Sequence, residues 1–339
     1  MSLRPSGSGV QTYARELLRA LPAFLPGAGL CATVQRDAVG ELPAQITASR
    51  RPVASGVRRV LWNAVPVPSV DLFHSLDVDL PLGQRGSTVS TFHDLSVFDT
   101  PWAFSRFRAT GERRLLRDAM RRADVLVAVS DFTAERIHDL SGRESVVTPL
   151  APAPWASPPT AERIAEVRAR FALPDRFVLQ VGTVEPRKSV ALVAEACRNL
   201  DVPFVLAGAG STGRDAPSSA LGLGYVETSD LPALYAAASV VAYASRYEGF
   251  GLPPLEAMAC GGAVVSSAVG ALPDFADDGA LLVTAHTVPA WTAALRATLL
   301  DGDTERALRR RGPEVASALT WARTAELTVG AYRNAGLRL

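Results

Sequence analysis

The sequence predicts an α/β fold made of two domains, in each of which parallel strands alternate with helices. The chain has 339 residues, which is too long for one ordinary core and suits two. Short β-rich apolar runs alternate with helical patterns, as parallel sheets with covering helices require. A proline-rich stretch over residues 149–159 lies near the middle of the chain, and we interpret it as the interdomain linker.

Composition narrows the classes of function. Apolar residues make up 48% of the chain and charged residues 20%, as in globular proteins, and the formal net charge is +1. This balance gives no reason to expect nucleic acid as a partner. No apolar run is long enough to cross a bilayer. Cys31, Cys197 and Cys260 lie far apart, without a CxxC pair or metal-ligand spacing, so we expect a cytoplasmic protein with no metal site.

The expected elements follow from local pattern. A helical pattern over 13–21 comes first, and the last helix, over 321–334, is expected to return to the N-terminal domain. We therefore place the N-terminal domain at 1–155, the C-terminal domain at 156–320 and the returning segment at 321–339. Ser130 is expected to cap the helix that follows it. Six runs are predicted to be strands, namely 70–73, 88–92, 125–129, 177–181, 204–207 and 240–243.

The beginning of the chain is unusual for this fold. A turn of glycine and serine over residues 6–9 leads directly into the first helical pattern. In α/β domains such a turn normally follows a strand. We therefore expect that the first strand of the N-terminal sheet is absent here or that the native start lies upstream.

The first candidate site follows the strand over 240–243. Gly249 and Gly251 allow a ligand to approach the backbone, and two prolines then mark the first turn of a helix. A helix start offers unpaired N–H groups and partial positive charge, which suit a phosphate. Glu248 in the loop and Glu256, expected in the first helical turn, could bind a sugar and a ribose. The alternative is that Glu256 complements the helix dipole and that Glu248 is solvated.

The second candidate site follows the strand over 177–181. Arg187 and Lys188 are expected near the carboxyl end of that strand, where open α/β sheets bind ligands. Arginine forms forked hydrogen bonds and lysine is a compact charge, so the pair could neutralise a diphosphate. The alternative is an ordinary solvated basic pair.

Three further features have weaker support. His93 ends an apolar run and could serve in a cleft as a hydrogen-bond donor or base, or could be a structural histidine bonded to nearby backbone; His74 has the same ambiguity. Residues 208–213 match the dinucleotide fingerprint, but no helical pattern follows, so we expect a loop. The helix over 104–122 has an arginine stripe opposite its apolar face, which is either a solvated face or a contact with an anionic acceptor or membrane surface.

Taken together, these segments resemble the retaining glycosyltransferases of the GT-B fold in family 4, which include many bacterial mannosyltransferases. The hallmark of that family is a Glu-x7-Glu motif in an EGFGLP-type segment, which residues 248–256 match. Residues 181–188 are similar to its diphosphate loop, 91–95 to its HDL segment and 9–13 to its N-terminal glycine loop. Thr183 stands where many relatives have arginine and where a subgroup, often mannosyltransferases, has threonine.

The resemblance implies transfer of a hexose, with GDP-mannose as the expected donor, to a glycan, a lipid-linked or a small-molecule acceptor with retained anomeric configuration. It implies no cofactor and no metal. The leaving phosphate is thought to help deprotonate the acceptor. Arg187 and Lys188 would hold the diphosphate, Glu256 the ribose and Glu248 the sugar. The implied catalytic residues are His93 and Glu248, and the implied donor-binding residues are Arg187, Lys188, Gly249, Phe250, Gly251, Leu252, Glu256 and Gly9.

Other interpretations remain open at this point. An epimerase or a phosphorylase can share the GT-B architecture, and epimerisation or phosphate dependence would identify them. An NAD-dependent oxidoreductase would need the 208–213 loop to open a helix. A carbohydrate-binding protein without catalysis would keep the cleft and show no turnover.

Overall fold

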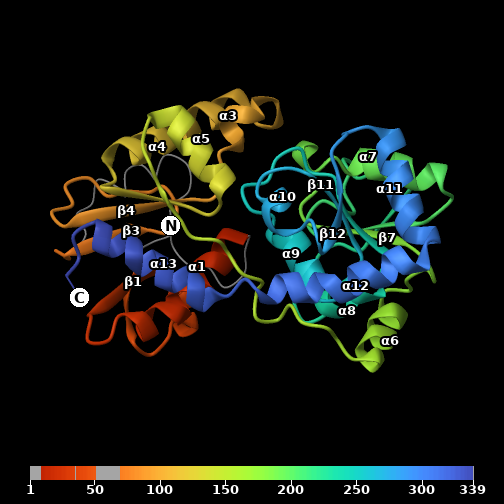
Figure 1. Cartoon of the computed structure of the whole chain (residues 1–339), viewed down its shortest axis with the longest axis horizontal. Coiled ribbons are helices and arrows are strands. Elements are labelled where there is room, and N and C mark those ends of the chain that lie inside the picture. The colour runs from red at the N-terminus through yellow and green to blue at the C-terminus, as the bar shows by residue number, and fades with distance from the viewer. Residues whose placement is uncertain (1–8, 35, 51–68, 339) are drawn as a thin grey trace. The chain divides into compact units, whose positions relative to one another are not determined.

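The computed structural model describes residues 9–34, 36–50 and 69–338, and the chain divides into two compact units (Figure 1). The N-terminal unit comprises Met1–Leu150 together with Thr320–Leu339, and the C-terminal unit comprises Ala151–Leu319. The division falls within the proline-rich stretch that the sequence analysis singled out.

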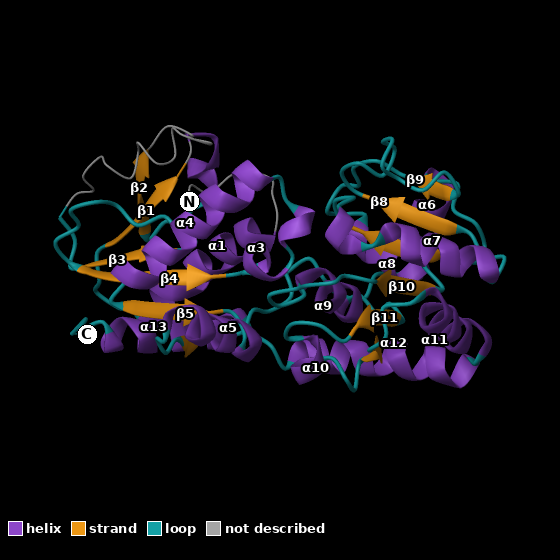
Figure 2. Cartoon of the chain, turned by 90° about the horizontal axis from the view of Figure 1, so that it is seen from above, coloured by secondary structure: helices purple, strands orange, loops and turns teal. Residues whose placement is uncertain are grey.

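The described strands of the N-terminal unit form two parallel sheets, a four-stranded sheet of order β3-β4-β5-β6 and a separate pair, β1-β2 (Figure 2). No strand precedes α1 among the described residues, and residues 1–8 lie outside them, so the absent first strand stays a prediction. The elements in chain order are α1 (Gly9–Ala20), η1 (Leu21–Phe24), β1 (Leu30–Val34), η2 (Arg36–Glu41), β2 (Ile46–Arg50), β3 (Leu72–Ser75), β4 (Ser87–Phe92), α3 (Ser96–Asp99), η3 (Pro101–Ala103), α4 (Arg106–Arg122), β5 (Val125–Ala128), α5 (Asp131–Ser141), β6 (Val146–Val147) and finally α13 (Trp321–Asn334).

Two local predictions for this unit are confirmed. The Ser130 hydroxyl accepts a hydrogen bond from the Thr133 amide and so caps α5. The apolar face of α4 packs into a core cluster with β4 and β5, through Leu116 and Met120, among others. At the end of the chain, α13 is bound to the N-terminal unit by hydrogen bonds such as the one from the Thr324 hydroxyl to the Pro149 carbonyl, 2.6 Å.

The described part of the C-terminal unit is one parallel sheet of order β12-β11-β10-β7-β8-β9. Helices α7 and α11 pack together in one layer, while α8, α9 and α12 form the other (Figure 1). Strands β8, β10 and β11 are buried throughout, as expected for parallel strands covered on both faces. The elements are α6 (Ala161–Arg170), β7 (Val178–Val181), η4 (Pro186–Lys188), α7 (Val190–Asn199), β8 (Phe204–Ala207), β9 (Ala220–Gly222), α8 (Leu231–Ala237), β10 (Val240–Tyr243), α9 (Leu252–Ala259), β11 (Val264–Ser267), α10 (Leu272–Phe275), β12 (Ala280–Val283), α11 (Val288–Leu300) and α12 (Gly302–Ser317).

One placement needs correction. Helix α9 begins at Leu252, so Glu256 lies in its second turn and the first turn holds no acidic residue. The helix starts earlier than expected because Gly251, with a φ of 105°, adopts the left-handed conformation that ends the preceding loop. The interpretation that Glu256 complements the helix dipole from the first turn is therefore wrong.

Candidate functional site

The two loops that the sequence analysis singled out lie together in the C-terminal unit. Strands β7 and β10 are direct neighbours in the sheet, so the loops that follow them leave from the same edge. The Arg246 amide donates to the Arg187 carbonyl, 2.9 Å, and the Arg187 guanidinium donates to the Tyr247 carbonyl, 2.6 Å. Both loops therefore open at one edge of the sheet.

Glu248 forms an ion-paired cluster with both cations of the first loop. Its Oε1 lies 2.5 Å from Lys188 Nζ, and its Oε2 lies 3.6 Å from the Arg187 guanidinium. Lys188 and Arg187 expose only 15% and 14% of their side chains, and Glu248 is buried. The interpretations of a solvated basic pair and a solvated Glu248 are therefore wrong.

The charge state of Glu248 follows from this cluster. Burial on its own would raise the pKa of Glu248, but Lys188 and Arg187 outweigh burial and lower the pKa below its ordinary value. Lys188 is also the only lysine in a chain whose other basic side chains are arginine and histidine. The site therefore places the compact ammonium charge of the single lysine against a buried, ionised carboxylate.

Glu256 has the opposite environment eight residues later. Burial raises the pKa of its carboxyl from 4.5 to about 8, and no ion pair or hydrogen bond to this carboxyl offsets the effect within the described residues. Glu256 interacts electrostatically with Cys260 and with Tyr235 and Tyr243, whose hydroxyls lie 3.1 Å apart. The two acids of one motif thus differ in charge near pH 7, and Glu256 can receive hydrogen-bond donors from a ligand.

The start of α9 offers a ligand main-chain groups rather than polar side chains. Pro253 and Pro254 have no N–H groups, so the amide of Leu252 is the first-turn donor in that stretch. The ring of Phe250 is buried and stacks on Phe275 with 5.0 Å between centroids. A ligand at Gly249, Phe250, Gly251 and Leu252 would therefore meet main-chain groups, as the sequence analysis expects.

Three residues that the sequence analysis did not identify support this site. A Cβ at Gly270 would lie 1.8 Å from the Glu248 carbonyl oxygen, so Gly270 fixes the backbone of Glu248 from behind. The buried Gln180 side chain donates to the Lys188 carbonyl, 3.0 Å. His286 lies 3.0 Å from the Ser189 hydroxyl, next to the same loop. Only the folded chain brings these residues together, because they come from separate strands and loops.

His93 follows β4 in the N-terminal unit. Its Nε2 lies 2.8 Å from the Leu76 carbonyl and must donate to it, so Nδ1 is the accepting nitrogen of the neutral ring. Burial lowers the pKa of His93, partly offset by Asp77, so the ring is neutral near pH 7. The backbone-bonded interpretation is confirmed for Nε2, and the ring can only accept, not donate, at Nδ1.

A buried polar network surrounds His93. The Thr91 hydroxyl contacts both the Tyr13 hydroxyl, 3.0 Å, and His74 Nε2, 2.8 Å. His74 Nδ1 lies 2.8 Å from the Tyr332 hydroxyl, so α13 also joins this network. Tyr13 packs edge-on against the His93 ring and lies on α1, the helix that begins at Gly9. His74 is therefore structural, and the role of Gly9 stays a prediction.

The glycine loop at 208–213 is a loop, as expected, and no helix follows it. Its Ala209 carbonyl accepts from the Val184 amide, 2.9 Å, and Gly208 lies so close to Gly182 that a Cβ would be 2.4 Å from the Gly182 oxygen. The loop braces the segment that carries Arg187 and Lys188. The dinucleotide-binding interpretation loses its structural basis.

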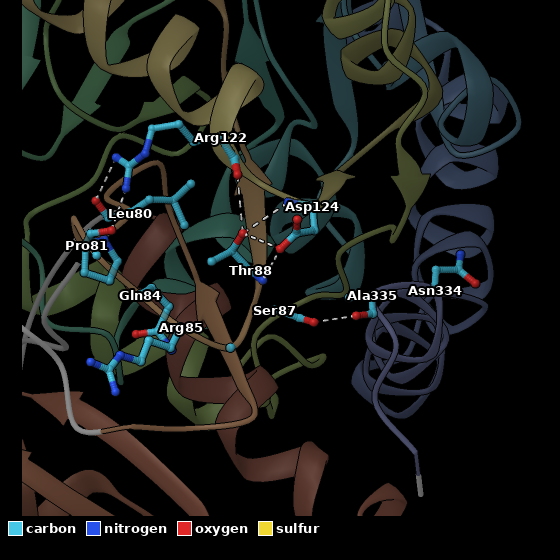
Figure 3. A pocket seen from close by; sticks show the side chains of 12 residues that line it. Leu80, Pro81, Gln84, Arg85, Ser87, Thr88, Arg122, Asp124, Asn334 and Ala335 are labelled. Carbon is cyan, nitrogen blue, oxygen red and sulfur yellow. Dashed lines mark hydrogen bonds between the residues drawn. The ribbon is translucent and has the colours of Figure 1, made fainter.

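A polar pocket in the N-terminal unit lies at the amino end of β4 (Figure 3). Two of its charged side chains are used internally: Arg122 donates to the Leu80 and Pro81 carbonyls, and Asp124 accepts from the Thr88 amide and hydroxyl. Parallel α/β sheets bind ligands at the carboxyl ends of their strands. This pocket is therefore not the candidate site.

None of the helices in ranges 9–34, 36–50 and 69–338 is both long and apolar enough to span a membrane. In the same ranges, histidine, cysteine and acidic side chains form no group of three that could hold a metal ion.

The chain is similar to known proteins over most of its length. A family described as Glycosyl transferases group 1 matches residues 163–315, which include both loops of the site. The O-antigen chain mannosyltransferase B of Escherichia coli is 31% identical over 282 residues, which cover 77% of this chain and 74% of that protein. The serotype-specific mannosyltransferase WbdA of the same species is 28% identical over 232 residues, but the chain spans only 27% of that longer protein.

The fold is also found among solved structures. The sucrose-phosphate synthase of Thermosynechococcus elongatus superposes with a TM-score of 0.78 at 22% identity, over 96% of this chain and 93% of that one. At this identity the likeness concerns the fold.

Proposed function

Since the chain belongs to the group 1 glycosyl transferases and has the GT-B fold, we propose that it transfers mannose from GDP-mannose to a hydroxyl group of a glycan, lipid-linked or small-molecule acceptor. The observation that carries the placement of the donor is the cluster of Lys188, Arg187 and Glu248 beside the start of α9. Thr183 and the mannosyltransferase relatives support the choice of mannose.

We assign the donor groups as follows. The diphosphate lies on Arg187 and Lys188, the ribose hydroxyls donate to Glu256, and the sugar extends toward Glu248. The buried carboxyl of Glu256 gains, from the ribose, hydrogen-bond donors that it lacks in the free protein. Gly9 and His93, from the N-terminal unit, complete the assignment by family resemblance.

The reaction breaks the bond between the anomeric carbon and the diphosphate oxygen and forms a bond from that carbon to the acceptor oxygen on the same face. The leaving diphosphate takes up the acceptor proton. Negative charge grows on the diphosphate as the first bond breaks, and the two cations with the Leu252 amide stabilise it. We propose that this positive charge replaces a metal ion, and that no cofactor takes part.

The test is turnover of GDP-mannose with candidate hydroxyl acceptors in the presence of a chelator. We expect GDP release, a product with the anomeric configuration of the donor, and an unchanged rate when divalent metals are removed. An inverted product, epimerised GDP-mannose or a requirement for inorganic phosphate would contradict the proposal and identify one of the alternative enzymes.

Substitution of His93 with alanine should lower the rate of transfer by about tenfold, the cost of one lost hydrogen bond to the sugar. Binding of the nucleoside diphosphate should not change, because His93 is assigned to the sugar alone. Stopped assays and calorimetry on the same protein separate the two effects. His138→Ala on the exposed side of α5 is the control, and loss of diphosphate binding in His93→Ala would contradict the assignment.

We also propose that the segment around the start of α4 contacts an anionic membrane surface in the cytoplasm. Phe107 and Trp102 are 87% and 56% exposed, and α4 carries seven arginines against Glu112 and Asp118. Exposed aromatic side chains beside cations suit the interface of an anionic bilayer. The three cysteines without disulfides favour the reducing side of that membrane.

Replacing Trp102 and Phe107 together with serine should weaken binding to vesicles of anionic phospholipid by about tenfold or more, since two large apolar side chains no longer enter the interface. Co-sedimentation with vesicles measures this. Leu300→Ser removes an equally exposed apolar side chain from α11 and should have no effect. Equal vesicle binding by the double variant and the wild type would refute the membrane contact.

A further inference from the structure

The carboxylate of Glu248 is paired with the two cations to which the proposed function assigns the donor diphosphate. In the proposed function Lys188 and Arg187 receive the phosphates of the donor, yet here both cations face Glu248. This pairing is unusual because Glu248 is itself assigned to a different part of the same donor, the sugar. If Glu248 touched only the sugar, its removal would leave binding of the nucleoside diphosphate unchanged.

The contact of Glu248 with Lys188 and Arg187 is closer and more buried than a transient ion pair at the surface. The side chains of all three residues are largely shielded from water. Shielded charges interact more strongly than charges at the surface do. A diphosphate added beside an ionised carboxylate in this place would meet like charge at short range. The ammonium and guanidinium groups must therefore be shared or released before a diphosphate is held tightly.

The backbone around Glu248 is held on two sides. Gly270 lies directly against the Glu248 carbonyl, and the Tyr247 carbonyl accepts from Arg187. The Glu248 side chain can rotate about its own bonds without shifting this backbone.

We propose that Glu248 is an internal anion that holds Lys188 and Arg187 until the donor diphosphate displaces it, and that the displaced carboxylate then binds the sugar hydroxyls of the same donor. The proposal rests on the proposed function and deepens it. A buried carboxylate that loses its cations needs new hydrogen-bond donors. The ribose hydroxyls of a nucleoside diphosphate are assigned to Glu256, and only the sugar of the intact donor supplies hydroxyl donors for Glu248, so the exchange favours the intact donor over the product.

Glu248→Gln tests the displacement directly, because glutamine keeps the size of the side chain and removes the charge. Among GDP, UDP, ADP and dTDP, the one that binds the wild type best is titrated into each variant by calorimetry. Glu248→Gln should bind it about three- to thirtyfold more tightly, because no carboxylate competes for Lys188. Glu185→Gln removes an equal charge from a carboxylate 3.7 Å from Arg187 that is 45% exposed, and should change the affinity by less than about twofold.

The second arm uses the matching nucleoside diphosphate mannose. Glu248→Gln should bind this sugar nucleotide no more tightly than the wild type does, because the gain at the phosphates is cancelled by the loss at the sugar. Combining Lys188→Met with Glu248→Gln should remove the gain for the nucleoside diphosphate, since the freed cation is then missing.

The outcomes separate the inference from the function. If the wild type binds a nucleoside diphosphate and Glu248→Gln binds it no more tightly, the displacement is overturned and the proposed function stands. If Glu248→Gln tightens both ligands equally, Glu248 merely repels phosphate and the transfer of its carboxylate to the sugar is overturned. If the wild type binds none of the four nucleoside diphosphates, the proposed function fails and the inference fails with it.

Discussion

Replacing Lys188 with alanine should weaken binding of the nucleoside diphosphate by about ten- to a hundredfold, the cost of one charge-assisted phosphate contact. Lys188 is the only lysine of the chain, and its ammonium lies in the ion-paired cluster of the loops that follow β7 and β10. Calorimetry with the free nucleoside diphosphate measures the effect without any assumption about the acceptor.

The same substitution also leaves Glu248 with Arg187 as its one remaining ion-pair partner among the described residues, so a loss of folding must be separated from a loss of binding. Lys188→Met combined with Glu248→Gln removes both charges, and should fold and still bind weakly. Arg198→Ala, on the exposed face of α7, is the control for loss of a positive charge. Wild-type affinity in a folded Lys188→Ala protein would show that the diphosphate lies elsewhere.

Substitution of Glu256 with glutamine should stabilise the free protein at neutral and alkaline pH while weakening nucleotide binding. The folded pKa of Glu256 is about 8, above the ordinary 4.5, so the folded state keeps a proton that the unfolded state releases. Stability of the wild type is therefore complete below about pH 4.5 and declines as pH rises toward 8. The glutamine variant avoids this decline, which is worth on the order of 3 kcal/mol at pH 7, about 2.5 pH units above the ordinary pKa.

Thermal unfolding from pH 5 to pH 8 tests this prediction. The melting temperature of Glu256→Gln should exceed that of the wild type by several degrees at pH 8, and the difference should nearly vanish at pH 5. Glu227→Gln changes an exposed carboxyl of the same unit and should show no such pH dependence. A constant difference in melting temperature across this pH range would contradict the raised pKa of Glu256. Unchanged nucleotide binding by Glu256→Gln would contradict the proposal that the carboxyl is kept in an unfavourable environment because it binds the ligand.

Much of the fold could be predicted from local pattern. The strands at 204–207 and 240–243 and the last helix at 321–334 begin and end where the sequence analysis placed them. Their signals are strong because apolar runs or helical periodicity are bounded by clear breaks. Strands such as β1, β6 and β9 are short, half-exposed or weakly apolar, and only their neighbours in the sheet define them.

The site was predictable as a set of residues but not as an arrangement. Motif spacing identified Arg187, Lys188, Glu248 and Glu256, because a loop between a strand and a helix is a local feature. The Glu248–Lys188 contact joins residues 60 positions apart and depends on β7 lying beside β10. The contact of Gly270 with Glu248 likewise joins two separate loops, and the bond from Gln180 to the Lys188 carbonyl depends on how the loop after β7 folds back, so neither is a feature of the sequence pattern.

The single lysine allows a direct test of where the diphosphate binds. Protein that carries lysine labelled with carbon-13 at Cε has one lysine side-chain signal, from Lys188. Titration with the nucleoside diphosphate that binds best should shift this signal in a saturable way, with the dissociation constant found by calorimetry, and the parent nucleoside should not shift it. A nucleoside diphosphate that binds by calorimetry yet leaves the Lys188 signal unmoved would contradict the account.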